Sequence, residues 1–280
     1  MSKFSIRLPR SRRLFYPLIS VAVALGITAT SLPPAQAISV FDLIRQGVQV
    51  IQLSNISDKQ EVELGRQINQ QLVSSEVKLY RNRDVNNYVN EIGQRLARTS
   101  DRPNLPFTFQ VVEDDAVNAF ATAGGFVYVN TGLIERADNE AELASVIAHE
   151  IGHITGRHLV EQMRRSAIAQ GVSQAAGLDR NAAVQIGVEL ALRRPRSRQA
   201  ELQADRSGLR NLARAGYAQS AMVSFMKKLL GSSSPPEFLS THPATSERIA
   251  ALQRQIDPKR ANVGMGLDSS AYKAQIRPLS

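Results

Sequence analysis

Two histidines four residues apart, with a glutamate beside the first, are the residues of this sequence best suited to metal chemistry. They are His149, Glu150 and His153. In a helix, positions four apart lie on one face, so both imidazoles can reach one metal ion, and Glu150 projects beside them towards a water that the metal would activate. The chain has only four histidines, so this spacing rarely arises by chance. The alternative is two unrelated histidines on a helix surface, and further ligands must decide between the two interpretations.

A catalytic zinc site needs a third protein ligand and an open position for water. His158 is the first candidate. In zincins with three histidines, which read H-E-x-x-H-x-x-G-x-x-H, the third would be residue 159, which is Leu159 here. On a continued helix, His158 points away from His149. We therefore expect His158 to be a surface residue or a cation near the helix C-terminus rather than a ligand.

Glu201 and Asp205 are the second candidate, one turn apart on a predicted helix. The carboxylate of Glu201 can complete a site of two histidines and one glutamate. Asp205 would accept the free ring N–H of a ligating histidine, with His149 the preferred partner, and so fix its tautomer. Taken alone, an acidic pair at this spacing is common on helix surfaces.

His242 is the third candidate, in a junction between a loop and a helix where its ring can swing. Two functional roles stay open. It could donate a hydrogen bond to the oxyanion that develops during the reaction, or it could occupy the fourth position on zinc and keep the enzyme idle. The remaining interpretation is a plain surface histidine.

The helix that carries the first two histidines has clear start signals. Asp138 and Asn139 offer N-cap oxygens, and Glu142 follows Asn139 at capping-box spacing. Apolar residues recur every four positions, which predicts one face for burial: Leu143, Ile147 and Ile151.

Before this helix the hydrophobic period changes to two. Residues 107–112, 118–122 and 126–130 are predicted strands, and Gly124-Gly125 predicts a hairpin between the last two. A strand beside the metal-site helix could pair with an extended peptide. The alternative is a hairpin that simply closes the sheet.

Other helices are indicated by caps and periodicity. Ser57 with Gln60 predicts a helix to about residue 73, and Asp84 is the expected cap of the next. Further helices are expected after Asp179, from Ser197 to near Gly216, over 220–230, and from 242 to about 256. Residues 163–195 are expected to form a helical hairpin or a mobile insertion, with ordinary packing or a lid over the site as its role. The arginines at 193, 194, 196 and 198 are expected to form a solvated cluster, with contact to anionic lipids as the minor alternative.

The first 37 residues predict a targeting signal. They hold five basic residues and no acid, then an apolar stretch, then Ala35-Gln36-Ala37 as a cleavage site. Arg12-Arg13 also resembles a twin-arginine signal, so the export route stays open. Because no charge occurs over 14–41, an uncleaved anchor is the alternative. We expect the remainder to be exported to a periplasm or equivalent envelope compartment.

Composition limits the function further. The net charge is +9, of which the signal segment supplies five, and the remaining +4 has no accompanying nucleic-acid motif, so we expect no nucleic acid partner. The chain has no cysteine, which excludes disulfides and thiolate ligands. Residues 38–56 predict an amphipathic helix, most simply packed on the core, with peripheral membrane contact as the alternative.

Several motifs in order resemble the M-48 family of peptidases. They are His149-Glu150-x-x-His153, Ser197-Arg198-x-x-Glu201-x-x-Ala204-Asp205, His242-Pro243 and Glu247-Arg248-Ile249. The resemblance covers roughly residues 57–255 and includes Asn118-Ala119-Phe120 before the hairpin. The chain ends soon after its last predicted helix, without the helical repeats that some members carry, so partner docking through such repeats is not expected.

The resemblance implies an α+β zincin domain of the gluzincin kind, mostly helical, with a small antiparallel sheet beside the active-site helix. It implies one Zn²⁺ bound by His149, His153 and Glu201, with Glu150 as the general base of peptide-bond hydrolysis. Protein or peptide substrates would lie extended along Asn118, Ala119 and Phe120. Misfolded or membrane-associated envelope proteins are the substrate class that it suggests. It gives Arg248 no defined role.

The sequence thus predicts a signal peptide over 1–37, an amphipathic helix over 38–56, a metallopeptidase domain over 57–256 and a loosely held tail over 257–280. A zinc-binding chaperone or regulatory protein with latent proteolysis is the second interpretation. An uncleaved, membrane-anchored scaffold is the third. The oligomeric state and the natural substrate are not predicted.

Overall fold

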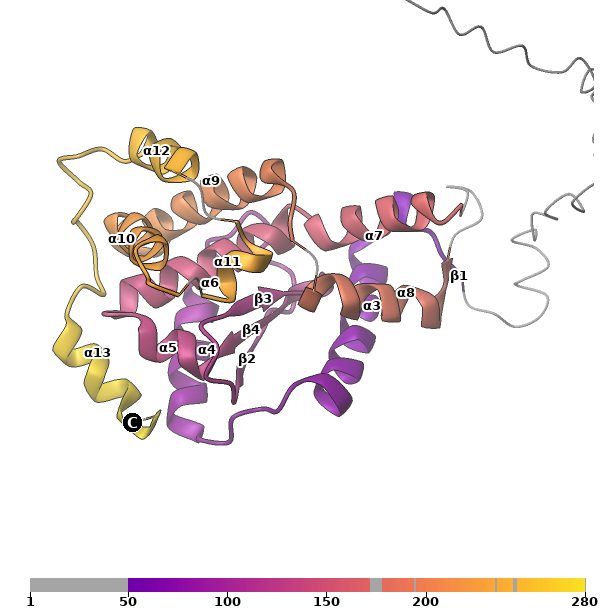
Figure 1. Cartoon of the computed structure of the whole chain (residues 1–280), viewed down its shortest axis with the longest axis horizontal. Coiled ribbons are helices and arrows are strands. Elements are labelled where there is room, and N and C mark those ends of the chain that lie inside the picture. The colour runs from indigo at the N-terminus through magenta and orange to yellow at the C-terminus, as the bar shows by residue number, and fades with distance from the viewer. Residues whose placement is uncertain (1–49, 172–177, 194, 235, 244–245, 280) are drawn as a thin grey trace, which may run out of the picture. The chain divides into compact units, whose positions relative to one another are not determined.

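The computed structural model describes residues 50–171, 178–193, 195–234, 236–243 and 246–279. Most of them are helical, around a three-stranded sheet, as expected for an α+β domain (Figure 1). The strands are β1 (Val50–Ile51), β2 (Thr108–Val112), β3 (Ala119–Ala121), β4 (Phe126–Asn130) and β5 (Leu178–Asp179). The helices are α3 (Asp58–Gln71), α4 (Arg83–Arg98), α5 (Thr131–Arg136), α6 (Glu140–Thr155), α7 (His158–Ala169), α8 (Arg180–Arg193), α9 (Arg198–Ala215), α10 (Ser220–Leu230), α11 (Phe238–Thr241), α12 (Ser246–Gln255) and α13 (Ser269–Ile276).

The sheet has the order β2-β4-β3, with β3 at one edge. The predicted hairpin is confirmed: β3 and β4 are antiparallel and joined through Gly124 and Gly125, both with positive φ. The expectation of an all-antiparallel sheet is wrong, because β2 pairs parallel with β4. The hairpin turns β4 back between the two earlier strands, and this return depends on tertiary packing, which the local pattern does not reveal.

Both faces of the sheet are buried. Alternate residues of β4 point to opposite sides. Val127 and Val129 belong to a core that includes α4 and α6, whereas Tyr128 belongs to a core that includes α3, α7 and α8. The sheet therefore separates two apolar clusters, and α6 is held on one of them.

Helix α9 packs along α6 at unusually short range. A Cβ added at Gly152 of α6 would lie 2.7 Å from the carbonyl oxygen of Ala204 in α9. Only a residue without a side chain permits this approach. The two helices that carry the predicted ligands are therefore fixed against one another by backbone contact.

The predicted caps are mostly confirmed. Asn139 accepts the Glu142 amide hydrogen at 3.0 Å, Ser57 and Gln60 form a complete capping box on α3, and Ser197 caps α9. The cap of α4 is Asn82 rather than Asp84, which lies within the first turn instead. Asn82 accepts from the amides of Asp84 and Val85, so the helix starts two residues earlier than the sequence suggested.

The signal peptide, and residues 38–49 of the predicted amphipathic helix, lie outside the described residues. Residues 50–56 are not part of an α-helix: β1 pairs antiparallel with β5, and a single 3₁₀ turn follows at Leu53–Asn55. The helical hairpin expected over 163–195 is present as α7 and α8, which pack together. Among the described helices none has the length and apolar character that crossing a bilayer requires.

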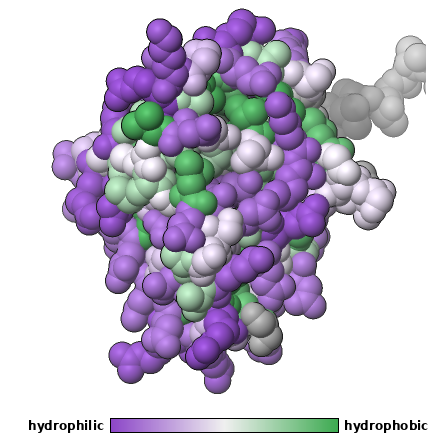
Figure 2. All heavy atoms as spheres, turned by 90° about the vertical axis from the view of Figure 1, so that its left-hand side faces the viewer, coloured by the Kyte–Doolittle hydropathy of each residue, from purple (hydrophilic) through white to green (hydrophobic). Residues whose placement is uncertain are grey.

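The C-terminal residues are not a loose tail. Tyr272 and Ile276 of α13 lie in the main core, and the Tyr272 hydroxyl donates to the Ile134 carbonyl at 2.6 Å. The segment before α13 is bonded to the start of α6, because the Gly266 carbonyl accepts a hydrogen bond from the Ala141 amide at 2.9 Å. Figure 2 shows the side that carries α10, α12 and α13 as largely hydrophilic, with small apolar areas between. Two buried side chains thus hold a helix that the polar tail sequence did not predict.

Candidate metal centre

Three side chains from two helices converge in the way expected for a metal site. The Nε2 atoms of His149 and His153, both on α6, are 3.0 Å apart. The carboxylate of Glu201, on α9, lies 3.2 Å from His153 Nε2 and 3.4 Å from His149 Nε2. All three side chains are buried.

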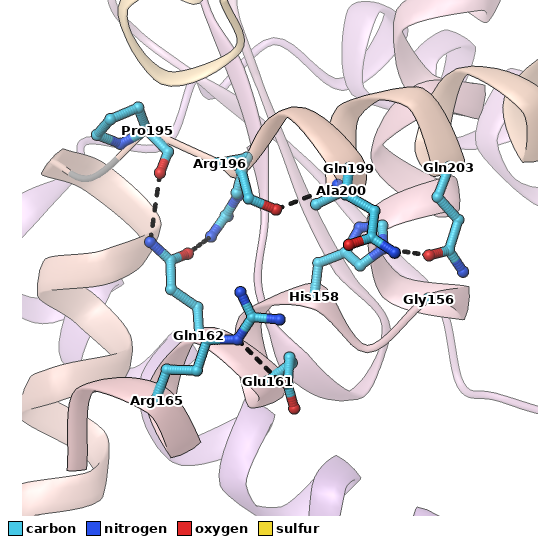
Figure 3. A pocket seen from close by; sticks show the side chains of 11 residues that line it. Gly156, His158, Glu161, Gln162, Arg165, Pro195, Arg196, Gln199, Ala200 and Gln203 are labelled. Carbon is cyan, nitrogen blue, oxygen red and sulfur yellow. Dashed lines mark hydrogen bonds and ion pairs between the residues drawn. The ribbon is translucent and has the colours of Figure 1, made fainter. Parts of the chain in front are cut away.

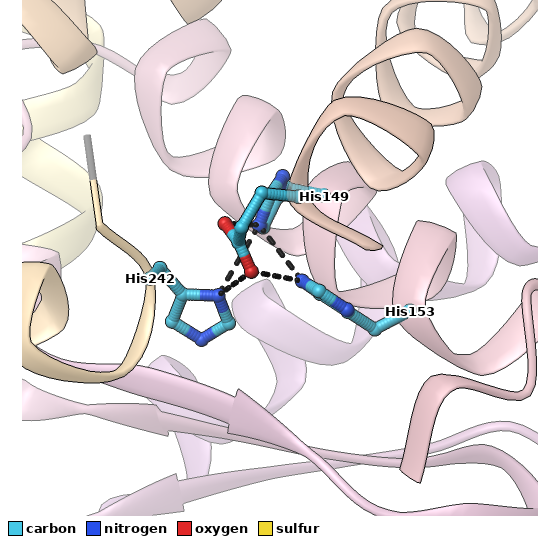
Figure 4. A group of neighbouring side chains, drawn as sticks. His149, His153 and His242 are labelled. Carbon is cyan, nitrogen blue, oxygen red and sulfur yellow. Dashed lines mark hydrogen bonds and ion pairs between the residues drawn. The ribbon is translucent and has the colours of Figure 1, made fainter. Parts of the chain in front are cut away.

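His242 supplies a fourth donor atom. Its Nδ1 lies 3.3 Å from His149 Nε2 and 3.2 Å from a Glu201 oxygen. Figure 4 shows its ring on a separate segment of chain, in contact with His149 and facing His153. Ligands at about 2.0–2.1 Å from a tetrahedral zinc ion are about 3.3–3.4 Å from one another. The separations among His149, His153 and Glu201 are close to these edges, and the donor atoms of all four residues lie within 4.8 Å of one another, so the group could hold one metal ion.

Glu150 lies beside this group but is not part of it. Its side chain is fully buried, and neither carboxylate oxygen has a hydrogen-bond partner. The His242 ring lies beside it, with Nε2 3.5 Å from one carboxylate oxygen. Burial raises the pKa of Glu150. An unpaired buried carboxylate costs stability, which is the pattern expected of a residue kept for chemistry.

A hydrogen-bonded pair supports His149 from behind. Asp205 lies 3.0 Å from His149 Nδ1, the partner that the sequence suggested. Arg248 binds both oxygens of Asp205 at 2.7 Å and also reaches Glu201 at 2.7 Å. Although burial opposes it, the Arg248 guanidinium holds the pKa of Asp205 below its ordinary value. The Glu247-Arg248-Ile249 motif was the only sequence signal of this residue.

Without metal, the pKa values of the two α6 histidines are shifted in opposite directions. Burial lowers the pKa of His149, but hydrogen bonds to Asp205 and Glu201 outweigh it and raise the pKa to about 9. For His153, burial dominates and the pKa falls well below its ordinary value. The pKa of Glu201 also falls, because His242 and His153 outweigh the effect of burial. The centre therefore holds a proton on His149 that a metal ion must displace.

The expectation of a surface position for His158 is wrong. Its ring is buried, and its Nδ1 lies 2.8 Å from Nδ1 of His153. Helix α6 ends at Thr155 instead of continuing, so the orientation expected on a continued helix does not apply. His158 stays outside the donor set that surrounds the metal position.

Arg196 is not part of a solvated cluster either. Arg193 and Arg198 are exposed, but Arg196 is buried, and its guanidinium donates to Gln162 at 2.8 Å and to the Ala121 carbonyl at 3.3 Å. Burial lowers the pKa of Arg196. This buried cation occupies the outer edge of β3, and nothing in the sequence distinguished it from its neighbours.

The three residues predicted to bind substrate, Asn118, Ala119 and Phe120, differ in their contacts. Asn118 donates to Glu237 at 3.1 Å, and the Phe120 ring stacks on Tyr128 with centroids 4.5 Å apart. Because Asn118 and Thr122 bond to β4, the intervening Ala119 and Ala121 direct their backbone groups to the open edge. The Ala121 carbonyl is already bonded to Arg196, and Ala119, although its backbone groups point away from β4, is fully buried.

A comparison with known protein families covers the same donor residues. The model of peptidase family M48 matches residues 83–256, which include every donor described above. The chain belongs to peptidase family M48. M48 members are metal-dependent, in agreement with the geometry of the four donors.

M48 relatives include the beta-barrel assembly-enhancing protease of Escherichia coli, 33% identical over 96% of this chain and 58% of the relative. The putative beta-barrel assembly-enhancing protease of Vibrio cholerae is 37% identical over 59% of this chain and 38% of its own length. The mitochondrial metalloendopeptidase OMA1 of Arabidopsis thaliana is 36% identical over 56% and 33%, respectively. The chain thus spans little more than half of the first relative.

Proposed function

We propose that this M48 protein is a zinc-dependent endopeptidase of the cell envelope. The observation that carries the proposal is the convergence of four buried donors next to Glu150, whose carboxylate oxygens have no hydrogen-bond partner. His149, His153 and Glu201 would hold the ion. Zinc, when bound, would polarise the scissile carbonyl and lower the pKa of the attacking water.

Glu150 is the proposed general base. It takes a proton from the attacking water and delivers it to the leaving amine, so it must stay off the metal to move that proton. Burial raises its pKa, which makes this carboxylate a stronger proton acceptor than an exposed glutamate. Asp205 fixes the tautomer of His149 by accepting its Nδ1–H, and Arg248 holds Asp205 in place.

His242 is the proposed latch of a closed state. Its Nδ1 stands at the fourth corner of the donor set, where water would otherwise bind. The Arg196 amide donates to the Thr241 carbonyl at 3.0 Å, which ties the segment before α9 to the His242 segment. Turnover requires the His242 ring to leave, and in that open state it could instead donate to the developing oxyanion.

The substrate class rests on less direct support. The position of β3 at the edge of the sheet, with the Ala119 backbone groups directed away from β4, favours an extended peptide paired with this strand. A relative named for enhancing beta-barrel assembly, and the export signal expected over 1–37, favour misfolded or membrane-associated envelope proteins. Peripheral membrane contact and a periplasmic or equivalent location are part of this proposal.

A zinc-binding chaperone or regulator is the second candidate function. The position of His242 favours it, because a fourth protein ligand is typical of a structural zinc site. Glu150 argues against this candidate, because a structural zinc site does not require a buried carboxylate that lacks hydrogen-bond partners.

Casein hydrolysis and zinc content decide between the two. We expect the purified protein to hold one zinc ion and to cleave casein, and Glu150→Gln to keep the zinc while activity falls about 10²- to 10⁴-fold. Glu113→Gln, at an exposed ion pair with Lys78, is the matched control and should keep activity. Zinc without turnover in both the wild type and His242→Ala would favour the binding protein, and absence of zinc would refute both candidates.

A further inference from the structure

Behind His153, on the side away from the metal position, lies a second imidazole. His158 Nδ1 is 2.8 Å from His153 Nδ1, and His158 Nε2 is 3.3 Å from the Gln203 side-chain oxygen. Figure 3 shows His158 and Gln203 on the wall of a cleft of about 430 Å³ between α7 and the start of α9. The three side chains form one line from the metal centre to this cleft.

The protons along this line follow from elementary bonding. A neutral imidazole carries one N–H, and a ring that offers its Nε2 lone pair to a metal must carry its hydrogen on Nδ1. His153 Nδ1 can therefore only donate, so His158 Nδ1 must accept. His158 then carries its own hydrogen on Nε2 and donates it to the Gln203 oxygen, which can only accept. Every donor in the line meets an acceptor.

We infer that His158 is a positioning residue of the metal centre: its Nδ1 accepts the Nδ1–H of His153 and holds that ring with Nε2 towards the metal. The inference rests on the proposed metallopeptidase function and deepens it. A ligating histidine usually donates its free N–H to a carboxylate or carbonyl. Asp205 takes this part for His149, whereas His153 has a neutral imidazole instead.

The backbone is shaped to bring His158 to this place. Arg157 has φ 53°, the one positive φ outside glycine among the described residues, and it turns the chain back after α6. Its guanidinium is anchored by Asp58, by Glu61 at 3.1 Å and by the Ile56 carbonyl at 3.2 Å. Such anchoring offsets the cost of a left-handed conformation in a residue with a side chain.

Gly156 leaves the space that the His158 ring needs. A Cβ at position 156 would lie 2.5 Å from His158 Nε2. The left-handed turn at Arg157 and the absence of a side chain at Gly156 therefore both allow the His158 ring to pack beneath His153.

The first test needs no variant. Long-range ¹H–¹⁵N spectra of the zinc-loaded wild-type protein should place the hydrogen of His153 on Nδ1 and that of His158 on Nε2. This tautomer pattern is a signature that a residue packed only for shape would not have to show. A hydrogen on His158 Nδ1 would overturn the inference.

The second test measures zinc affinity by competition with a chelator. His158→Leu should weaken zinc binding about 10- to 100-fold. His158→Asn, whose side-chain oxygen can take the place of Nδ1 as acceptor, should restore most of the loss. Gln203→Ala removes only the far end of the line and should have the smaller effect. Equal affinities of the wild type and His158→Leu would contradict the inference.

Measurements of stability and activity distinguish a failure of this inference from misfolding of the variant and from failure of the proposed function. Thermal unfolding of the metal-free variants shows whether His158→Leu folds, and if it does not, the tautomer result still decides. Zinc binding without casein cleavage in both the wild type and His242→Ala would refute the proposed function and leave this inference standing. A wild type that binds no zinc would overturn both.

Discussion

Arg248 donates hydrogen bonds of 2.7 Å to both oxygens of Asp205, which in turn lies 3.0 Å from Nδ1 of His149. The same guanidinium reaches Glu201, so one buried cation compensates two buried carboxylates from α9. The metal-ligand geometry on α6 and α9 thus depends on a residue of α12, far along the chain.

Removal of this cation should destabilise the protein strongly. Arg248→Gln leaves two buried carboxylates without their cation, and breaking a buried pair costs about 3–5 kcal/mol. Urea unfolding of the metal-free protein measures the change. Arg198→Gln, at an exposed pair with Glu247, is the control and should change the stability far less, because solvent screens an exposed ion pair. Equal losses in the two variants would show that burial of Arg248 is not the cause.

Zinc binding should release a proton and strengthen as pH rises. His149 has a pKa of about 9 without metal, so it is protonated at pH 7, whereas a ligand must be neutral. We expect about one proton released per zinc at pH 7, and apparent affinity rising about tenfold per pH unit up to pH 9. Calorimetry in buffers of different ionisation enthalpy measures the release. Asp205→Asn removes the stronger raising contact and should reduce it, while a buffer-independent heat would contradict the prediction.

Gly152→Ala should damage the metal centre through the helix contact. The added methyl carbon would lie 2.7 Å from the Ala204 oxygen and push α9, with Glu201, away from α6. Overpacking of this kind costs about 1–3 kcal/mol, and zinc affinity should fall with it. Gly231→Ala, whose added carbon meets no atom nearer than 3.4 Å, is the matched control and should bind zinc normally.

His242→Ala should raise casein hydrolysis several-fold. Removal of the ring frees the fourth corner, while three ligands remain to hold zinc. Leu239→Ala, in the same segment but without a donor atom at the centre, should leave the activity near that of the wild type. A fall in activity with zinc retained would instead assign His242 to stabilisation of the transition state.

Local signals predicted the active-site helix well. The cap at Asn139, the four-residue histidine spacing and the apolar face all act within one helix, so the sequence alone determines them. Glu201 and Asp205 lie one turn apart for the same reason. Their meeting with α6 depends on tertiary contact, and only several motifs in a fixed order indicated it.

The features that the sequence missed depend on non-local packing or on a single backbone angle. The position of His158 follows from the left-handed turn at Arg157, and residues with side chains seldom adopt this conformation. The buried state of Arg196 comes from its contact with β3, which sequence cannot distinguish from the exposed arginines beside it. Helix α13 is stabilised mainly by Tyr272 and Ile276, too few apolar residues for a clear periodic pattern.

Helix α6 is buried on every side, since all residues from 141 to 154 are enclosed. Its amide hydrogens should therefore exchange with solvent only when the whole domain unfolds, in the slowest class of the protein. The two histidines on it cannot be displaced by fraying of one element. Loss of the histidine geometry and loss of the fold then become a single cooperative event, and α6 would serve as the slowest-exchanging reporter of global stability.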